Sequence, residues 1–108
     1  MPTRSQLLAS VRSEREVERP QLVFAYAQTS GASRRADGFL AQVLQRRRNH
    51  DSFRLYRLEV RQRPELAQRL GIEEVPTLLV IEEGKIAARL VRPRGCSEVR
   101  SFLAPWLR

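Results

Sequence analysis

The chain has 108 residues, 42% of them hydrophobic, and a formal net charge of +8 at pH 7. This length supports one modest core, so we expect a single domain over residues 1–108. No stretch approaches the roughly 18 continuous apolar residues of a membrane-spanning helix, and the start of the sequence lacks the apolar core of a signal peptide. We therefore expect a soluble, cytoplasmic protein with no membrane contact.

The single cysteine and the single lysine set two further limits. Cys96 has no partner for an internal disulfide, which suits a reducing compartment and leaves an intermolecular disulfide open. Because Lys85 is the only lysine, almost all of the positive charge comes from arginine. The base composition of the genome explains this usage as well as a selected surface does. If the arginines cluster, their field favours acidic proteins or nucleic acid.

The first half of the chain predicts a helix, a strand and a second helix. Within residues 1–20, apolar side chains recur among polar ones as in an amphipathic helix, and Pro20 ends it. The apolar run at 22–27 is typical of a strand buried on both faces of a sheet. A turn at 29–33 then leads into a helix that we expect to finish in the three arginines at 46–48, whose cations complement its dipole.

The second half predicts three strands and two helices. A strand over 53–60 precedes a short helix over 64–70, which has proline in its first turn and glycine just past its end. Strands at 77–82 and 85–91 flank a hairpin turn at Glu83 and Gly84, and a last helix is expected from about 97 to 107. The predicted order is α-β-α-β-α-β-β-α.

Two segments in this order resemble the thioredoxin family. Tyr26 and Ala27 lead into the turn before a helix, and Gly71 is followed by Pro76 and Thr77 and then by the two apolar strands of the hairpin. The resemblance covers residues 21–107. It implies an α/β thioredoxin-like fold with a central mixed four-stranded sheet flanked by helices, in which the family's additional N-terminal edge strand is missing.

The resemblance places Ser30 and Ser33, separated by Gly31 and Ala32, where the family carries its redox cysteines. A thioredoxin exchanges electrons because a thiolate attacks a disulfide and a second cysteine resolves the intermediate. Hydroxyl groups cannot do this, so we expect no catalytic residue. The simplest role of Ser30 is to cap the helix that follows.

At other positions too, the sequence differs from the residues that the resemblance implies, and the differences again remove redox features. Phe24 replaces a buried aspartate that helps to move protons, and Arg92 replaces a glycine that lines the substrate groove. Further replacements are Thr29 for a tryptophan, Gly38 for a kinking proline and Arg61 for an acidic residue, whereas Arg57 keeps the family's positive charge. Each change removes a redox or substrate-docking feature.

The segment around Pro76 is the best candidate for a retained function. The resemblance implies a cis peptide between Val75 and Pro76 that turns the backbone toward the helix after Ser30, where it can pair with an extended substrate. The expected protein-binding groove consists of Thr29, Ser30, Gly31, Ala32, Ser33, Val75, Pro76, Thr77 and Arg92. We expect no cofactor and, with one cysteine and one histidine, no metal.

These features favour a redox-inactive, thioredoxin-like protein-binding module, acting as an adaptor, assembly chaperone or complex subunit and existing as a monomer or small oligomer. Three alternatives stay open. The serines were engineered into an oxidoreductase, or Ser30 with Arg34 and Arg35 holds glutathione, or the arginine surface binds nucleic acid. Separately, Cys96 is either a redox-sensitive thiol or a small inert residue at a helix start.

Overall fold

The computed structural model describes residues 19–46 and 52–107. The elements are β1 (Gln21–Tyr26), α2 (Gly31–Gln45), β2 (Arg54–Glu59), α3 (Pro64–Arg69), β3 (Thr77–Glu82), β4 (Lys85–Val91) and α4 (Cys96–Leu103). From residue 21 onward this is the predicted order. The N-terminal helix predicted within residues 1–20 lies almost wholly outside the described residues, as do Arg47 and Arg48.

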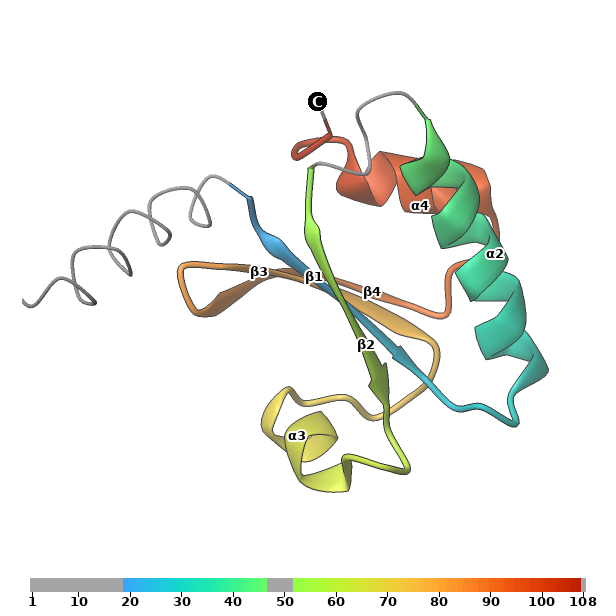
Figure 1. The fold of residues 1–108 in the computed structure, drawn as a ribbon, viewed down its shortest axis with the longest axis vertical. Coiled ribbons are helices and arrows are strands. Elements are labelled where there is room, and N and C mark those ends of the chain that lie inside the picture. The colour runs from blue at the N-terminus through green and yellow to red at the C-terminus, as the bar shows by residue number, and fades with distance from the viewer. Residues whose placement is uncertain (1–18, 47–51, 108) are drawn as a thin grey trace, which may run out of the picture.

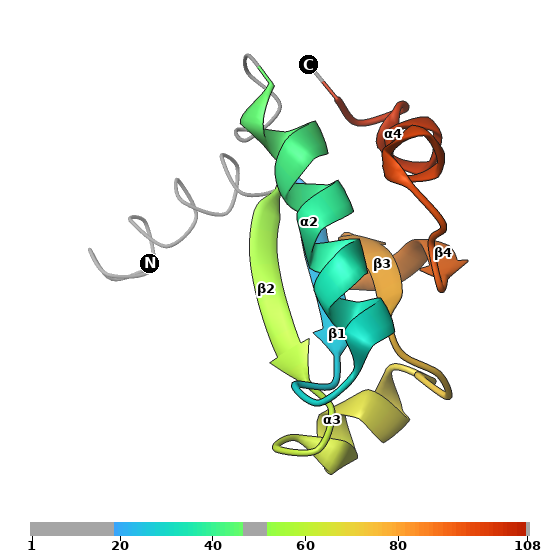
Figure 2. The ribbon, with the colours of Figure 1, turned by 90° about the vertical axis from the view of Figure 1, so that its right-hand side faces the viewer.

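The strands form one mixed sheet in the order β2-β1-β3-β4 (Figure 1). β1 runs parallel to β2 and antiparallel to β3, and β3 and β4 form the antiparallel hairpin. Helices α2 and α4 cover one face of the sheet, and α3 lies toward the other (Figure 2). The predicted thioredoxin-like α/β class is confirmed, and in the described part of the chain no strand precedes β1.

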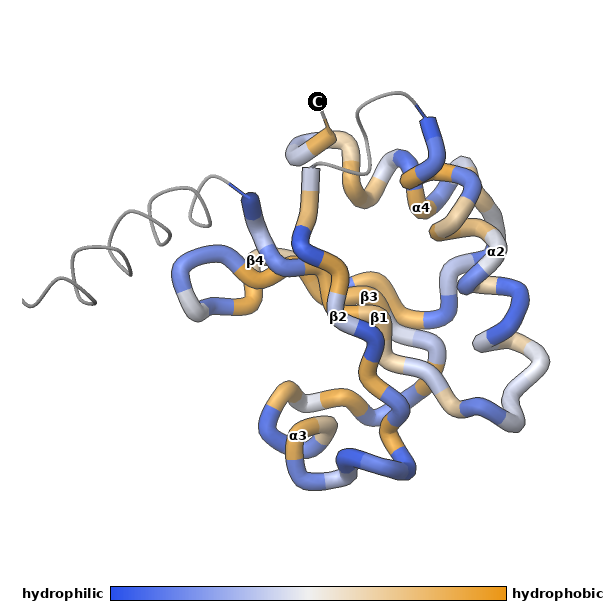
Figure 3. Tube along the Cα trace, in the orientation of Figure 1, coloured by the Kyte–Doolittle hydropathy of each residue, from blue (hydrophilic) through white to orange (hydrophobic). Residues whose placement is uncertain are grey.

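The core is divided by β1, whose four central residues are at most 2% exposed. Leu22 and Phe24 face α2 and α4, whereas Val23 and Ala25 face α3. Hydrophobic residues predominate in the middle of the sheet (Figure 3), and the buried residues of α2 and α4 pack against Leu22 and Phe24. Burying one such large side chain contributes roughly 1.5–3 kcal/mol, so β1 anchors both layers.

Two helices end earlier than expected. The last turn of α2 ends at Gln45, before the arginines, and α4 ends at Leu103. Pro105 accounts for the second difference: Ala104 before it still has helical dihedral angles, but proline has no N–H with which to continue the helical hydrogen bonds. The chain then forms a tight turn that packs Trp106 against Phe53 and Phe102, with ring centroids 6.5 Å apart in both pairs.

No helix in the described ranges is long and apolar enough to cross a membrane.

Candidate functional site

The turn between β1 and α2 is held together by the two serines. Ser30 has an extended backbone and its Oγ accepts the Ser33 N–H at 3.1 Å, so it caps α2 as predicted. The Oγ of Ser33 in turn accepts the Ala27 N–H at 3.1 Å, and this side chain is only 3% exposed. Both hydroxyl oxygens therefore act as structural acceptors in the turn.

The segment before β3 lies opposite this turn. The peptide between Val75 and Pro76 is cis, which confirms that prediction. The Pro76 carbonyl accepts the Arg92 N–H at 2.8 Å, and the Thr77 hydroxyl donates to the Glu74 carbonyl at 2.6 Å. The N–H and C=O of Val75 form no hydrogen bond within the described residues. The N–H and C=O of Val75 are thus left unpaired, whereas its neighbours Glu74, Pro76 and Thr77 are held by hydrogen bonds.

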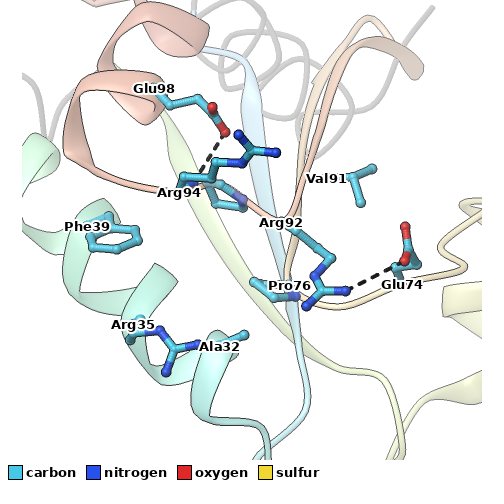
Figure 4. Close-up of a pocket in the computed structure, with 10 residues that line it drawn as sticks. Ala32, Arg35, Phe39, Glu74, Pro76, Val91, Arg92, Arg94 and Glu98 are labelled. Atoms are coloured by element: carbon cyan, nitrogen blue, oxygen red, sulfur yellow. Dashed lines mark hydrogen bonds and ion pairs between the residues drawn. The ribbon is translucent and has the colours of Figure 1, made fainter.

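A groove of about 750 Å³ runs beside Pro76, between α2 and the β4–α4 connection (Figure 4). It is lined by Ala32, Arg35, Phe39, Glu74, Pro76, Val91, Arg92, Pro93, Arg94 and Glu98. Three of these, Ala32, Pro76 and Arg92, belong to the groove expected from the sequence. The others became visible only in three dimensions, because α2 and the β4–α4 connection are more than 45 residues apart in the chain.

The remaining residues of the expected groove lie around its lining. Val75 and Thr77 flank Pro76 in the chain, and Ser30 and Gly31 start α2. Thr29 is exposed and its Oγ1 accepts a hydrogen bond from Arg61 at 3.1 Å. Ser33 turns away from the groove and lines a second pocket of about 420 Å³ on the side of β2.

Phe24 contributes to this second pocket and occupies the place expected for a buried acid. Its ring is 1% exposed and stacks on Tyr26 with centroids 5.4 Å apart. The guanidinium of Arg57 lies 5.7 Å from the Phe24 ring centroid and is paired with Asp37 at 2.6 Å. The positive charge of Arg57 is thus balanced by a surface carboxylate and by an aromatic face, and Phe24 offers no group that carries a proton.

Glu59 joins the two loops at this end of the sheet. Its carboxylate accepts the Gln28 N–H at 2.8 Å and the Arg61 N–H at 2.6 Å, and the residue is 8% exposed. The hydrogen bond from Gln28, followed by the one from Arg61, holds the pKa of Glu59 below its ordinary value of 4.5. No sequence motif announced this contact, because Gln28 and Glu59 are 31 residues apart.

The lowered pKa of Glu59 sets the direction of a pH effect. A carboxyl whose pKa is lower in the folded state than in the unfolded state stabilises the fold above pH 4.5, and this contribution is lost as the pH falls through the folded value. We expect Glu59→Gln to unfold at lower urea concentration than the parent at pH 6.5, with a smaller difference at pH 3. Glu83→Gln, in the exposed hairpin turn, controls for the loss of one carboxylate. A difference that stays constant with pH would contradict this role.

Arg92 combines an unusual backbone with a position in the groove. Its φ is 51°, in the left-handed region where a side chain is disfavoured. Its guanidinium lies 4.0 Å from the Glu74 carboxylate, and because both side chains are more than half exposed, this pair adds little stability. This backbone conformation favours glycine, the residue that the resemblance implies at this position, and gives arginine a conformational cost.

We expect Arg92→Gly to raise the free energy of unfolding by up to about 1 kcal/mol, since relief of the left-handed conformation is worth about 1–2 kcal/mol and part of it is offset by unfolded-state entropy. Arg94→Gly, at a residue without positive φ, is the matched control and should destabilise. Urea denaturation of both variants measures the effect. Equal destabilisation by the two glycines would contradict strain at Arg92.

Outside the groove, Cys96 and Arg63 form hydrogen bonds with nearby side chains. The thiol of Cys96 is half-buried at the start of α4 and donates to Gln42 Oε1 at 2.7 Å. Arg63 donates to the Tyr56 hydroxyl at 3.3 Å. Within the described residues no cluster of three metal-ligating side chains is present. A glutathione site at Ser30, a nucleic-acid surface and a redox-sensitive Cys96 stay predictions from the sequence.

Comparison with known proteins agrees with this geometry. The sequence model of the thioredoxin family matches residues 7–105. Similar solved structures include thioredoxin from Fasciola hepatica, at 19% identity and a TM-score of 0.73 over 94% of this chain and 93% of that one. Thioredoxin from Malassezia sympodialis has 14% identity and a TM-score of 0.75 over 91% and 84% of the two chains. No curated protein matches the sequence significantly.

The sheet, the capped α2 and the loop before β3 therefore define a thioredoxin-like domain. Since the family model spans most of its length, the chain belongs to the thioredoxin family.

Proposed function

We propose that this thioredoxin-family protein binds protein partners non-covalently in the groove beside Pro76, without thiol exchange, as an adaptor, assembly chaperone or complex subunit. The observation that carries the proposal is the free backbone of Val75 at the edge of the 750 Å³ groove. An extended peptide can hydrogen-bond to such a unit while its side chains enter the groove, as in strand addition.

The chemistry at the start of α2 supports binding in place of catalysis. Ser30 and Ser33 use their oxygens to hold the turn, and neither is a thiol. A serine nucleophile would need a general base within hydrogen-bond reach, yet the hydrogen bonds of these two hydroxyls within the described residues are with backbone N–H groups. The turn therefore positions the start of α2, where Ala32 lines the groove.

The first test compares a groove variant with a cap variant. Peptides selected from a displayed random library by the immobilised parent protein are titrated calorimetrically against each variant. We expect Pro76→Ala to weaken binding at least about tenfold, because the ring of Pro76 lines the groove. Ser30→Ala loses the cap, about 1 kcal/mol of stability, but should keep the affinity within about twofold, because Ser30 lies outside the lining.

Because Pro76→Ala can also alter the fold, Val91→Glu serves as a second groove variant. Val91 is 40% exposed on β4, so glutamate is tolerated there but places a desolvation cost and a negative charge at the groove. Thermal unfolding confirms that each variant is folded. Equal loss of affinity in the groove and cap variants, or no loss in any of them, would refute binding in this groove.

A second test addresses the missing redox chemistry. The double variant Ser30→Cys plus Ser33→Cys restores both thiols but leaves Phe24 in place of an acid. We expect it to reduce insulin disulfides at least about 10²-fold more slowly than a thioredoxin assayed in parallel, because a positioned acid or base contributes roughly 10²–10⁴-fold. A rate equal to that of thioredoxin would show that the two serines alone silence a working oxidoreductase.

A further inference from the structure

We infer that the segment bound by this groove is acidic. In the free protein Glu74 pairs with Arg92, and on binding a carboxylate of the partner takes the place of the Glu74 carboxylate. The inference rests on the proposed function, since it names the chemical class of the partner for the same groove. It is carried by the arrangement of charges along the groove and not by the net charge of the chain.

Three guanidinium groups and two carboxylates line the groove. The carboxylate of Glu98 is already used, since it accepts the Arg94 backbone N–H at 3.3 Å in front of the first turn of α4. The guanidinium groups of Arg35 and Arg94 have no hydrogen bond or ion pair with any described residue. The Arg35 guanidinium lies beside Gly31 at the start of α2: a Cβ atom added to Gly31 would be 3.5 Å from Arg35 Nη1. The groove therefore offers unpaired cations on two of its walls.

Arg92 supplies the third cation, and its ion pair with Glu74 is weak enough to be exchanged for another. Its Nη1 is 4.0 Å from Glu74 Oε1, at the outer limit of an ion pair, and the two side chains are 62% and 58% exposed. A carboxylate that approaches to hydrogen-bond distance can form two parallel bonds with a guanidinium, which are shorter and stronger than this contact. An incoming acidic side chain can therefore take the place of Glu74.

The ion pair of Arg92 and Glu74 lies next to the unpaired backbone of Val75. The Arg92 side chain passes beside Pro76 toward Glu74 (Figure 4). Glu74 and Pro76 are the two neighbours of Val75, so Arg92 lies along the stretch whose backbone is free. In an extended peptide, alternate side chains point to the same side about 6.5–7 Å apart. A peptide with alternating acidic residues can thus pair with Val75 and present carboxylates to Arg92 and to Arg35 or Arg94.

The test uses two synthetic probes that differ only in charge. One is a blocked hexapeptide of alternating valine and glutamate, and the other carries glutamine in place of each glutamate. Each is titrated into ¹⁵N-labelled full-length protein at low salt and at 0.5 M salt while the amide signals are followed. We expect the glutamate peptide to bind at least about tenfold more tightly at low salt and to shift the amides of Val75, Thr77 and Arg92, with the preference falling at high salt.

Matched variants separate the groove from the overall charge. Arg92→Gln should bring the affinity for the glutamate peptide close to that for the glutamine peptide. Arg100→Gln removes the same charge from the exposed side of α4, outside the groove, and should leave the preference within about twofold. Glu74→Gln should strengthen binding of the glutamate peptide about two- to threefold, because the competing carboxylate is gone, and should leave the glutamine peptide unchanged.

The outcomes distinguish this inference from the proposed function. If both peptides shift Val75 and Thr77 with equal affinity, the groove binds peptides without regard to charge, so the inference is overturned and the proposed function stands. If Arg92→Gln and Arg100→Gln weaken binding equally, a diffuse positive field explains the preference, and the inference is again overturned. If neither peptide shifts these amides and the library selection also yields no groove-dependent ligand, both fail together.

Discussion

Burial of β1 on both faces is the constraint that organises this molecule. The strand pairs with β2 on one side and β3 on the other, and its four central side chains divide between the two layers of the core. The central residues of a strand in this position must be apolar, which leaves no place for a polar group between Gln21 and Tyr26. Polar side chains of this strand are therefore restricted to its ends, and the candidate site is built from α2, the loop before β3 and the segment from the end of β4 to the first turn of α4.

Hydrogen bonds that join the loops to the strands and to α2 maintain the shape of the groove. The loop after β1 is tied to β2 through the carboxylate of Glu59 and to its own helix through Ser30 and Ser33. The loop before β3 is tied to β4 through the bond between Pro76 and Arg92. The two loops are thus fixed by separate contacts, and within the loop before β3 the backbone of Val75 is left for a ligand.

Motif and periodicity were sufficient to predict the sheet, the hairpin turn and the cap of α2, because each depends on residues close together in the chain. They also located Ala32, Pro76 and Arg92 through the family resemblance. They did not reveal the acceptor role of Glu59 or the contribution of Arg35 and Arg94 to the groove, since these depend on how distant loops meet. The left-handed backbone of Arg92 was hidden for another reason: nothing local to an arginine predicts a conformation that arginine disfavours.

The use of both serine oxygens as acceptors in one short turn has an evolutionary consequence. Sulfur is a weak acceptor, so a cysteine at position 30 or 33 would exchange a good hydrogen bond to Ser33 N–H or Ala27 N–H for a poor one. A lineage that passes through this sequence loses fold stability at the first step back toward a dithiol, before any second thiol is present to reward it. A return to two cysteines at positions 30 and 33 therefore needs two substitutions, the first of which weakens the turn without completing the pair.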